Sequence, residues 1–300
     1  MNKWSKGILI FGVVTCITGL SMMIIGIQSD GIRSFLSLSR KPVYDSRVED
    51  RIFDKDIEHL DISLTEHALQ ITESYDDKIH IQYHPTVAGK DNLLLSVNDK
   101  ALTVTDSNPS EHRFLGSGIE GLLQIASDYS SRFDEVILSL PKGKDFTGLT
   151  IQVDHRDISI SKVQLSNATI KSNGALLRIN DSHIKNSQLN TTGIINIFQT
   201  SLTDTHIKSQ HEHIVSKDID IHGHVEMEAQ SQRLQLSKSE LDRIYLDLTT
   251  LDGSILDFSK PPKNASDRKI MDNPYKSGNQ DNKDQLFLKS YGDIGFSLHY

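Results

Sequence analysis

The chain has 300 residues and carries 32 Lys and Arg against 40 Asp and Glu, a formal net charge of −8. This acidic balance argues against a protein that holds nucleic acid through its phosphates, and a single cysteine excludes an internal disulfide or a multi-cysteine metal cluster. The hydrophobic fraction of 37% and the aromatic fraction of 6% are low for a chain built around one thick core.

The first predicted element is a membrane-spanning helix over residues 7–27. These 21 residues contain no charge and, at about 1.5 Å per helical residue, cross a hydrocarbon core about 30 Å thick. Residues 1–6 form a short tail with Lys3 and Lys6. A cleavable signal peptide has a similar basic start, but it has a shorter apolar region and a small-residue cleavage site. We therefore predict an uncleaved signal anchor, followed by a juxtamembrane linker over 28–47.

The flanking charges leave two orientations open. Two Lys precede the apolar segment and four Lys or Arg follow it before residue 48, which favours a cytoplasmic domain by the positive-inside rule. A short basic tail at the start of a chain is instead typical of an export signal. Residues 1–47 hold six basic and two acidic groups, or +4, so the remaining 253 residues carry −12.

After the linker, nearly all of the chain is predicted to form strands, and residues 48–300 form one β-domain. Period-two alternation of apolar and polar residues marks 60–64, 68–71, 78–83, 93–97, 101–105 and 133–140. We expect 48–140 to form a β cap. One exception, residues 118–129, has near-helical apolar spacing and is predicted to be a short helix that covers the end of the solenoid or docks a partner.

From residue 149 onward, apolar residues recur with a period near nineteen. They form three predicted columns: Ile151, Ile170, Leu189, Ile207, Val225 and Ile244; Ile158, Leu177, Ile195, Ile214 and Leu234; Leu165, Ile184, Leu202, Ile221 and Leu241. Each unit makes one coil of a parallel β-solenoid, whose stacked columns need only a thin core. The predicted fold is therefore an all-β, single-chain parallel β-solenoid, with repeats over 149–259, a loop insertion over 260–283 and a closing coil over 284–300 at the far end.

Two motifs frame the repeats. Val136–Pro141 is a strand that ends in Leu-Pro, and Leu286–Phe296 contains Gly-Asp-Ile. With the strand–turn–strand repeats between them, they resemble a bacterial putative-adhesin family of β-strand-repeat proteins of unknown function, although Arg156-Asp157-Ile158 lacks the family's glycine. The resemblance covers residues 55–300, implies a cell-envelope location and supplies no catalytic residues. With this implication we favour a single-pass protein of the cell membrane whose C-terminal domain is extracellular.

Two clusters are candidates for metal binding. Five histidines lie close together in the sequence: His206, His211, His213, His222 and His224. His206 and His224 are nearly one coil apart, so they could stack closely enough for both imidazoles to bind one zinc ion. The alternative is that these histidines are polar residues on a solvated face. Asn167, Asn186, Asp204 and Asp242 recur at the coil period with Gly223 in the gap. These oxygen-bearing residues suit calcium, but their types favour turns, and we interpret them as turn residues.

Two groups of acid and base residues are candidates for catalysis. His155-Arg156-Asp157 and the pair Asp218 and Asp220 are the residue types of polysaccharide-acting β-helix enzymes, the alternative function. We interpret both as surface charge and predict no catalytic, cofactor-binding or metal-ligating residue. The predicted function is a membrane-anchored, extracellular, non-enzymatic protein that acts as an envelope interaction, adhesin-like or envelope-stress scaffold. Its expected partners are the membrane, through the N-terminal helix, and a protein or cell-wall polymer, with no nucleic acid.

Overall fold

The structure, a computed structural model, describes residues 46–86, 93–106, 134–174, 176–259 and 269–299, together with Gly12, Thr15, Thr18 and Ser21. The chain divides into two compact units, and all strands named below lie in the unit formed by Val48–Tyr83, Leu93–Ser107 and Asp134–Tyr300.

Several predicted elements lie outside the described residues. They are the tail 1–6, most of the membrane helix 7–27, linker residues 28–45, the short helix 118–129 and loop residues 260–268. The four described positions within 7–27 are helical. Among the residues that the structure does describe, no helix has both the length and the apolar character needed to cross a membrane.

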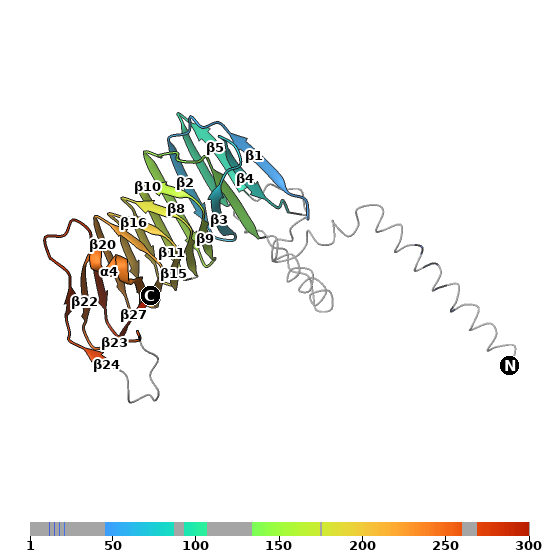
Figure 1. Cartoon of the computed structure of the whole chain (residues 1–300). Coiled ribbons are helices and arrows are strands. Elements are labelled where there is room, and N and C mark those ends of the chain that lie inside the picture. Colours follow the sequence, from blue (N-terminus) through green and yellow to red (C-terminus); the bar gives the residue numbers. More distant parts are fainter. Residues whose placement is uncertain are drawn as a thin grey trace, which may run out of the picture. The chain divides into compact units, whose positions relative to one another are not determined.

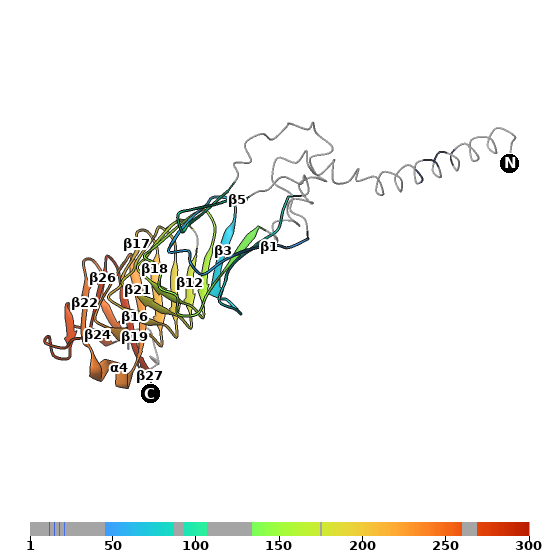
Figure 2. The ribbon, with the colours of Figure 1, turned by 90° about the horizontal axis from the view of Figure 1, so that it is seen from above.

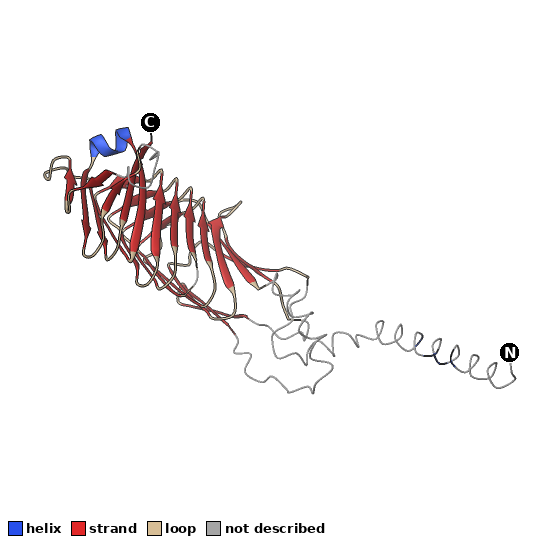
Figure 3. Ribbon diagram, turned by 90° about the horizontal axis from the view of Figure 1, so that it is seen from below, coloured by secondary structure: helices blue, strands red, loops and turns tan. Residues whose placement is uncertain are grey.

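Three sheets make up the sides of a stack of coils, and α4 (Lys238–Arg243) is the one helix among the elements drawn in colour (Figures 1 and 3). The 12-stranded sheet contains, in spatial order, β1 (Glu49–Phe53), β4 (Ile79–Tyr83), β7 (Glu135–Leu140), β3 (Ala68–Glu73), β9 (Ile158–Ser161), β12 (Leu177–Asn180), β15 (Ile195–Phe198), β18 (His213–Lys217), β21 (Ser231–Ser237), β27 (Ile294–His299), β23 (Ile255–Asp257) and β24 (Lys269–Met271).

The 11-stranded sheet contains β25 (Tyr275–Ser277), β22 (Tyr245–Thr250), β26 (Gln285–Ser290), β20 (His224–Ala229), β17 (His206–Ser209), β14 (Gln188–Thr191), β11 (Ala168–Asn173), β8 (Gly148–Asp154), β2 (His59–Leu64), β6 (Ala101–Asp106) and β5 (Leu93–Asn98). The 4-stranded sheet contains β10 (Gln164–Ser166), β13 (His183–Lys185), β16 (Ser201–Thr203) and β19 (Asp220–His222). Each central coil contributes one strand to each sheet, and equivalent strands of successive coils pair in parallel.

The predicted columns are confirmed through the first four coils. Ile151, Ile170, Leu189 and Ile207 align in register, as do the corresponding residues of the second and third columns. All of these side chains are buried, because alternate residues of each strand point into the narrow core. The fold class is therefore confirmed as all-β with parallel sheets.

The fifth coil departs from the predicted columns. Ile207 aligns with Met227 instead of Val225, and Ile214 aligns with Gln232 instead of Leu234. Paired residues are 20 positions apart between β17 and β20, against 18 between β14 and β17, so β20 is shifted by two. The bend between β20 and β21 is one residue, whereas three separate β17 from β18, which offsets the shift before β21 pairs with β18. A shift of two keeps the same residues inward, and period-two alternation therefore does not reveal it.

Gln232 consequently enters an aliphatic column with 5% of its surface exposed. Its Nε2 donates to the carbonyls of Met227 (3.0 Å) and Lys289 (2.6 Å), which satisfies the buried amide nitrogen. The predicted members Leu241 and Ile244 of the other columns lie in and directly after α4, where a helix replaces the third strand of the coil.

The bends of the coils have left-handed backbone conformations at regular intervals. Asn167, Asn186, Asp204 and Gly223 have φ of 55°, 49°, 47° and 62°, which confirms the prediction that they are turn residues. Asp242 is different, because it lies in α4. A second row of left-handed residues, not predicted, turns the chain between the 12-stranded and 4-stranded sheets: Lys162, Asp181, Gln199 and Asp218.

Buried hydroxyls follow these bends. Ser182, Ser187, Thr200 and Thr205 each come directly after a left-handed residue, and each donates to the carbonyl two residues before it at 2.7–2.8 Å. Because a buried hydroxyl without a partner costs free energy, this local bond lets polar residues occupy inward positions at the bends.

Both ends of the stack reverse the chain order. The coil of β26 and β27 lies between the coil of β20 and β21 and that of β22 and β23, so the predicted position of the closing coil 284–300 at the far end is wrong. At the opposite end, β2 and β3 lie inside β6 and β7. Outermost strands β1, β4, β5, β24 and β25 pair antiparallel to their neighbours, and β24 and β25 occupy part of the predicted loop 260–283.

The edge strand β1 is held by a buried imidazole. The ring of His80, on β4, is fully buried, with Nδ1 3.1 Å from Asp50 Oδ2 on β1 and Nε2 3.0 Å from Asp76 Oδ1. Burial acts to lower the pKa of His80, but the hydrogen bonds and charges of Asp76 and Asp50 outweigh it and raise the pKa above 6.5.

We expect this clamp to make stability depend on pH. Since the folded-state pKa of His80 is raised, its contribution is fully present below pH 6.5 and is lost as the pH rises through the raised value. Urea unfolding between pH 6 and 9 should show a stability decline that His80→Asn removes. His155→Asn, at an exposed bend, is the matched control and should keep the wild-type slope; the same slope in the His80 variant would contradict the assignment.

Candidate functional site

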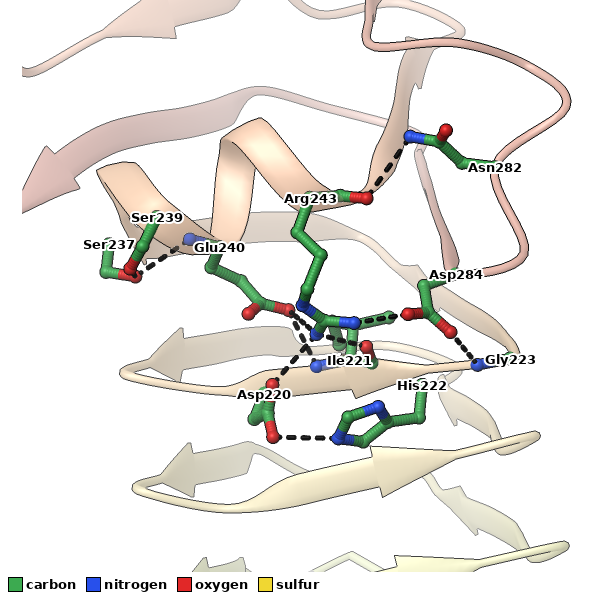
Figure 4. Close-up of polar contacts among 10 residues, drawn as sticks. All are labelled: Asp220, Ile221, His222, Gly223, Ser237, Ser239, Glu240, Arg243, Asn282 and Asp284. Atoms are coloured by element: carbon green, nitrogen blue, oxygen red, sulfur yellow. Dashed lines mark hydrogen bonds and ion pairs between the residues drawn. The ribbon is translucent and has the colours of Figure 1, made fainter.

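The densest polar network among the described residues surrounds Arg243 at the end of α4 (Figure 4). Its Nη2 donates to Asp220 Oδ1 (2.8 Å), to Glu240 Oε1 (2.7 Å) and to the carbonyl of Ile221. Its Nη1 is bonded to the carboxylate of Asp284, which also accepts the Gly223 amide at 2.8 Å. One guanidinium thus connects a helix, strand β19 and the residue that precedes β26.

The network covers the open edge of the 4-stranded sheet. Strand β19 is the last strand of that sheet, and its outer edge would expose backbone groups. Glu240 Oε1 accepts the Ile221 amide at 2.8 Å, while Arg243 donates to the Ile221 carbonyl. Two side chains of α4 therefore supply the acceptor and the donor that a further strand would supply.

The sequence around α4 explains why a helix forms there. Ser237 has an extended backbone, and its Oγ accepts the Glu240 amide at 3.1 Å, the bond of a helix N-cap. In Ser-x-x-Glu sequences the glutamate commonly bonds back to the cap residue. Here Glu240 is bonded to β19 and Arg243 instead, so it joins the helix to the sheet.

The pKa values of Glu240 and Asp220, the two carboxylates beside Arg243, are shifted in opposite directions. Burial raises the pKa of Glu240, although the Ile221 amide and Arg243 act against that rise. Burial also disfavours ionisation of Asp220, yet the hydrogen bond with His222 and the charge of Arg243 hold its pKa below the usual range. Such divergence occurs at acid–base sites, but here each carboxylate is bonded to protein groups that shape the sheet edge. The arrangement fits a structural cap.

A second cluster joins His206, Glu226 and Glu228, whose possible ligand atoms all lie within 4.8 Å of one another. The carboxylates already have partners: Lys208 Nζ lies 2.6 Å from Glu228 Oε2, and Lys289 is bonded to Glu226. Each of the two negative charges is therefore already paired with an ammonium group. The cluster therefore forms a charged ladder on the outside of the 11-stranded sheet.

The structure does not stack His206 on His224, the arrangement that a metal site would need. The shifted register aligns His206 with Glu226, while His224 aligns with Gln285 and packs against Phe287 at 4.8 Å between ring centroids. His213 lies on the 12-stranded sheet and His222 on the 4-stranded sheet, and His211 lies in the bend before β18, so the structure does not bring the five histidines together.

The candidate catalytic residues are not brought together in one site either. Arg156 pairs with Asp134 at 2.8 Å, Asp157 accepts the Leu176 amide at 3.0 Å, and His155 occupies a left-handed bend. Asp218 is a bend residue, whereas Asp220 belongs to the Arg243 network. Sequence reasoning did not identify Arg243 and Glu240; the signal available was the Ser237-x-x-Glu240 cap inside a strand repeat.

The chain is similar to one protein family and to solved structures of two proteins. The family model described as Toastrack DUF4097 matches residues 57–296. A solved structure of a putative cell adhesion protein from Clostridium sporogenes is 12% identical, with a TM-score of 0.32, over 84% of this chain and 99% of the other. One of a putative adhesin from Bacteroides fragilis is 11% identical, with a TM-score of 0.34, over 85% and 98%. No curated protein matches the chain.

Proposed function

Because the chain belongs to the Toastrack DUF4097 family, an adhesin-like family of unknown function, we propose that it is a non-enzymatic binding protein of the cell envelope. It is anchored through residues 7–27 and exposes its β-solenoid outside the cell, as an adhesin-like or envelope-stress scaffold. The carrying observation is that three of the acid and base candidates, Arg156, Asp157 and Asp220, are bonded to other groups of the protein, and that the other two, His155 and Asp218, occupy bends.

The solenoid suits display and binding. Its parallel coils offer flat outer faces on which side chains recur at the strand spacing of about 4.8 Å. Repeated, rigid rows of this kind fit an extended partner that makes many similar contacts. In the central strands β8–β21 the exposed residues are polar or charged, which keeps such a surface soluble.

Cysteine labelling of intact cells tests the display. Leu251 is 69% exposed, so a full-length Leu251→Cys chain should react with a membrane-impermeant maleimide before lysis. A Leu202→Cys chain, whose side chain is buried, is the matched control and should stay unlabelled in the folded protein. Labelling of Leu251→Cys only after lysis would contradict an extracellular domain.

A further inference from the structure

The 12-stranded sheet has the longest run of neighbouring strands without an acidic residue in the described part of this acidic protein. The 11-stranded sheet has a run of three (β11, β14 and β17), and so has the 4-stranded sheet (β10, β13 and β16). Six adjacent strands, β9, β12, β15, β18, β21 and β27, contain no Asp or Glu, although residues 48–300 carry −12. Figure 2 labels three of these strands, β12, β18 and β21; β15 lies between β12 and β18, and β18 and β21 are neighbours. We name the outward-facing surface of these six strands the cationic face.

Two arginines stand in one row of this face. The register aligns Arg178, Asn196, Val215 and Arg233 across β12, β15, β18 and β21. Both arginines are exposed, and neither has a carboxylate partner within the described part of the chain. Three strand spacings separate them, or about 14 Å.

The neighbouring row adds a third cation and an aromatic ring. Asn180, Phe198, Lys217 and Gln235 align across the same four strands. Among the described residues, acidic residues border the face at the bends: Asp157, Asp181, Glu212, Asp218 and Asp293. Lys217 Nζ is 4.0 Å from Asp218 and His213 Nδ1 is 3.8 Å from Glu212. Asp157 and Asp293 accept the amides of Leu176 and Ser254.

A second aromatic side chain adjoins Arg233. The guanidinium carbon lies 6.0 Å from the ring centroid of Phe258. Next to Arg233 in the register is Gly295, and a Cβ placed there would come within 2.9 Å of the Phe258 ring. Glycine therefore leaves the space that lets Phe258 lie over β27 beside the arginine.

We propose that the cationic face binds a linear acidic polysaccharide. This proposal rests on the proposed function, because only a domain outside the cell would meet such polymers. Guanidinium groups pair with carboxylates through two parallel hydrogen bonds, and two of them in one row can engage two different residues of a chain of repeating acidic sugars. Asn180, Asn196 and Gln235 supply amides for sugar hydroxyls. Phe198 and Phe258 supply apolar surfaces for the faces of the rings, and the absence of carboxylates removes repulsion.

Binding of polygalacturonate by the detergent-solubilised full-length chain tests the proposal. We expect saturable binding that weakens with salt, and no binding of the methyl-esterified polymer, which has the same backbone without the charge. The double variant Arg178→Gln with Arg233→Gln should bind tenfold or more weakly. Lys171→Gln with Lys185→Gln removes the same charge from the other two sheets and should bind like the wild type.

A second measurement uses the wild-type protein alone. Polygalacturonate should protect Arg178 and Arg233 from an arginine-specific dicarbonyl reagent. Equal loss of affinity in the two double variants, unprotected arginines, or equal binding of inorganic polyphosphate would overturn the proposal. If polygalacturonate does not bind but Leu251→Cys is labelled on intact cells, the proposed function still stands. If incubation with the protein produces new reducing ends in the polymer, the protein cleaves it, which would contradict the non-enzymatic part of the proposed function.

Discussion

Replacing Arg243 with alanine is expected to lower the free energy of unfolding by about 2–4 kcal/mol. The side chain is 35% exposed, but it is the shared partner of Asp220, Glu240 and Asp284. Without it, the half-buried carboxylates repel one another and the Ile221 carbonyl loses its donor at the sheet edge. Removing one partner of a buried charged group costs more than the pair contributes when intact, because the remaining charges stay desolvated.

Equilibrium urea unfolding of the full-length protein, followed by circular dichroism, would measure this change. Lys238→Ala is the matched control, since Lys238 pairs with Asp242 on the exposed side of the same helix. Exposed pairs of this kind contribute about 0.5 kcal/mol or less. If the two variants were equally stable, Arg243 would not act as the cap of β19.

The central coils were predictable because their physics is local and repeated. Inward residues alternate along each strand and recur once per coil, so Ile151, Ile170 and Leu189 are recognisable without any knowledge of pairing. The bend residues were predictable for a related reason. Asn, Asp and Gly tolerate left-handed backbone, and Asn167, Asn186 and Gly223 recur where every coil must turn.

The order of the terminal coils was not predictable from periodicity. An apolar strand such as β26 can pair with any neighbour of matching alternation, and nothing in its own residues states that it lies between β20 and β22. The two-residue shift that places Met227 beside Ile207 was not predictable either, because it leaves the alternation of inward and outward residues unchanged. Both outcomes depend on contacts between residues far apart in the sequence.

The cationic face and the Arg243 network could not be predicted from the sequence, because charge can be read there only along the chain. Arg178 and Arg233 are 55 positions apart in the sequence and join one row only through the register of four strands. The Arg243 network is a single, non-repeating feature that joins residues from β19, α4 and the segment before β26. Its members are individually ordinary surface types.

Replacing Asp106 with alanine should have the largest effect, about 3–5 kcal/mol of lost stability. This carboxylate, 5% exposed, ends β6 and is bonded to the turn between β2 and β3. Its Oδ1 lies 2.8 Å from His67 Nδ1, and its Oδ2 accepts the amides of Thr65 and Glu66 and the Thr65 hydroxyl. Alanine would remove this acceptor from the buried His67 ring and from the Thr65 and Glu66 amides of the turn.

The same carboxylate should contribute to unfolding in acid. Burial acts to raise the pKa of Asp106, but the hydrogen bond and charge of His67 and the two backbone amides hold it below 3.8. Since the folded-state pKa is depressed, the contribution is present above pH 3.8 and is lost as the pH falls through the lower folded value. Asp106→Asn, which keeps the shape without titrating, should therefore lose less stability than the wild type over that acid range.

Denaturant unfolding at neutral pH and along a series below pH 5 separates these two effects. Asp61→Ala is the matched control, because Asp61 lies on the exposed side of β2, and a surface substitution of this kind changes stability by about 0.5 kcal/mol or less. An Asp106→Ala protein as stable as Asp61→Ala would show that the turn does not depend on the carboxylate. If instead Asp106→Asn followed the wild-type acid curve, the pH dependence would come from other carboxyl groups, and the depressed pKa of Asp106 would not be its source.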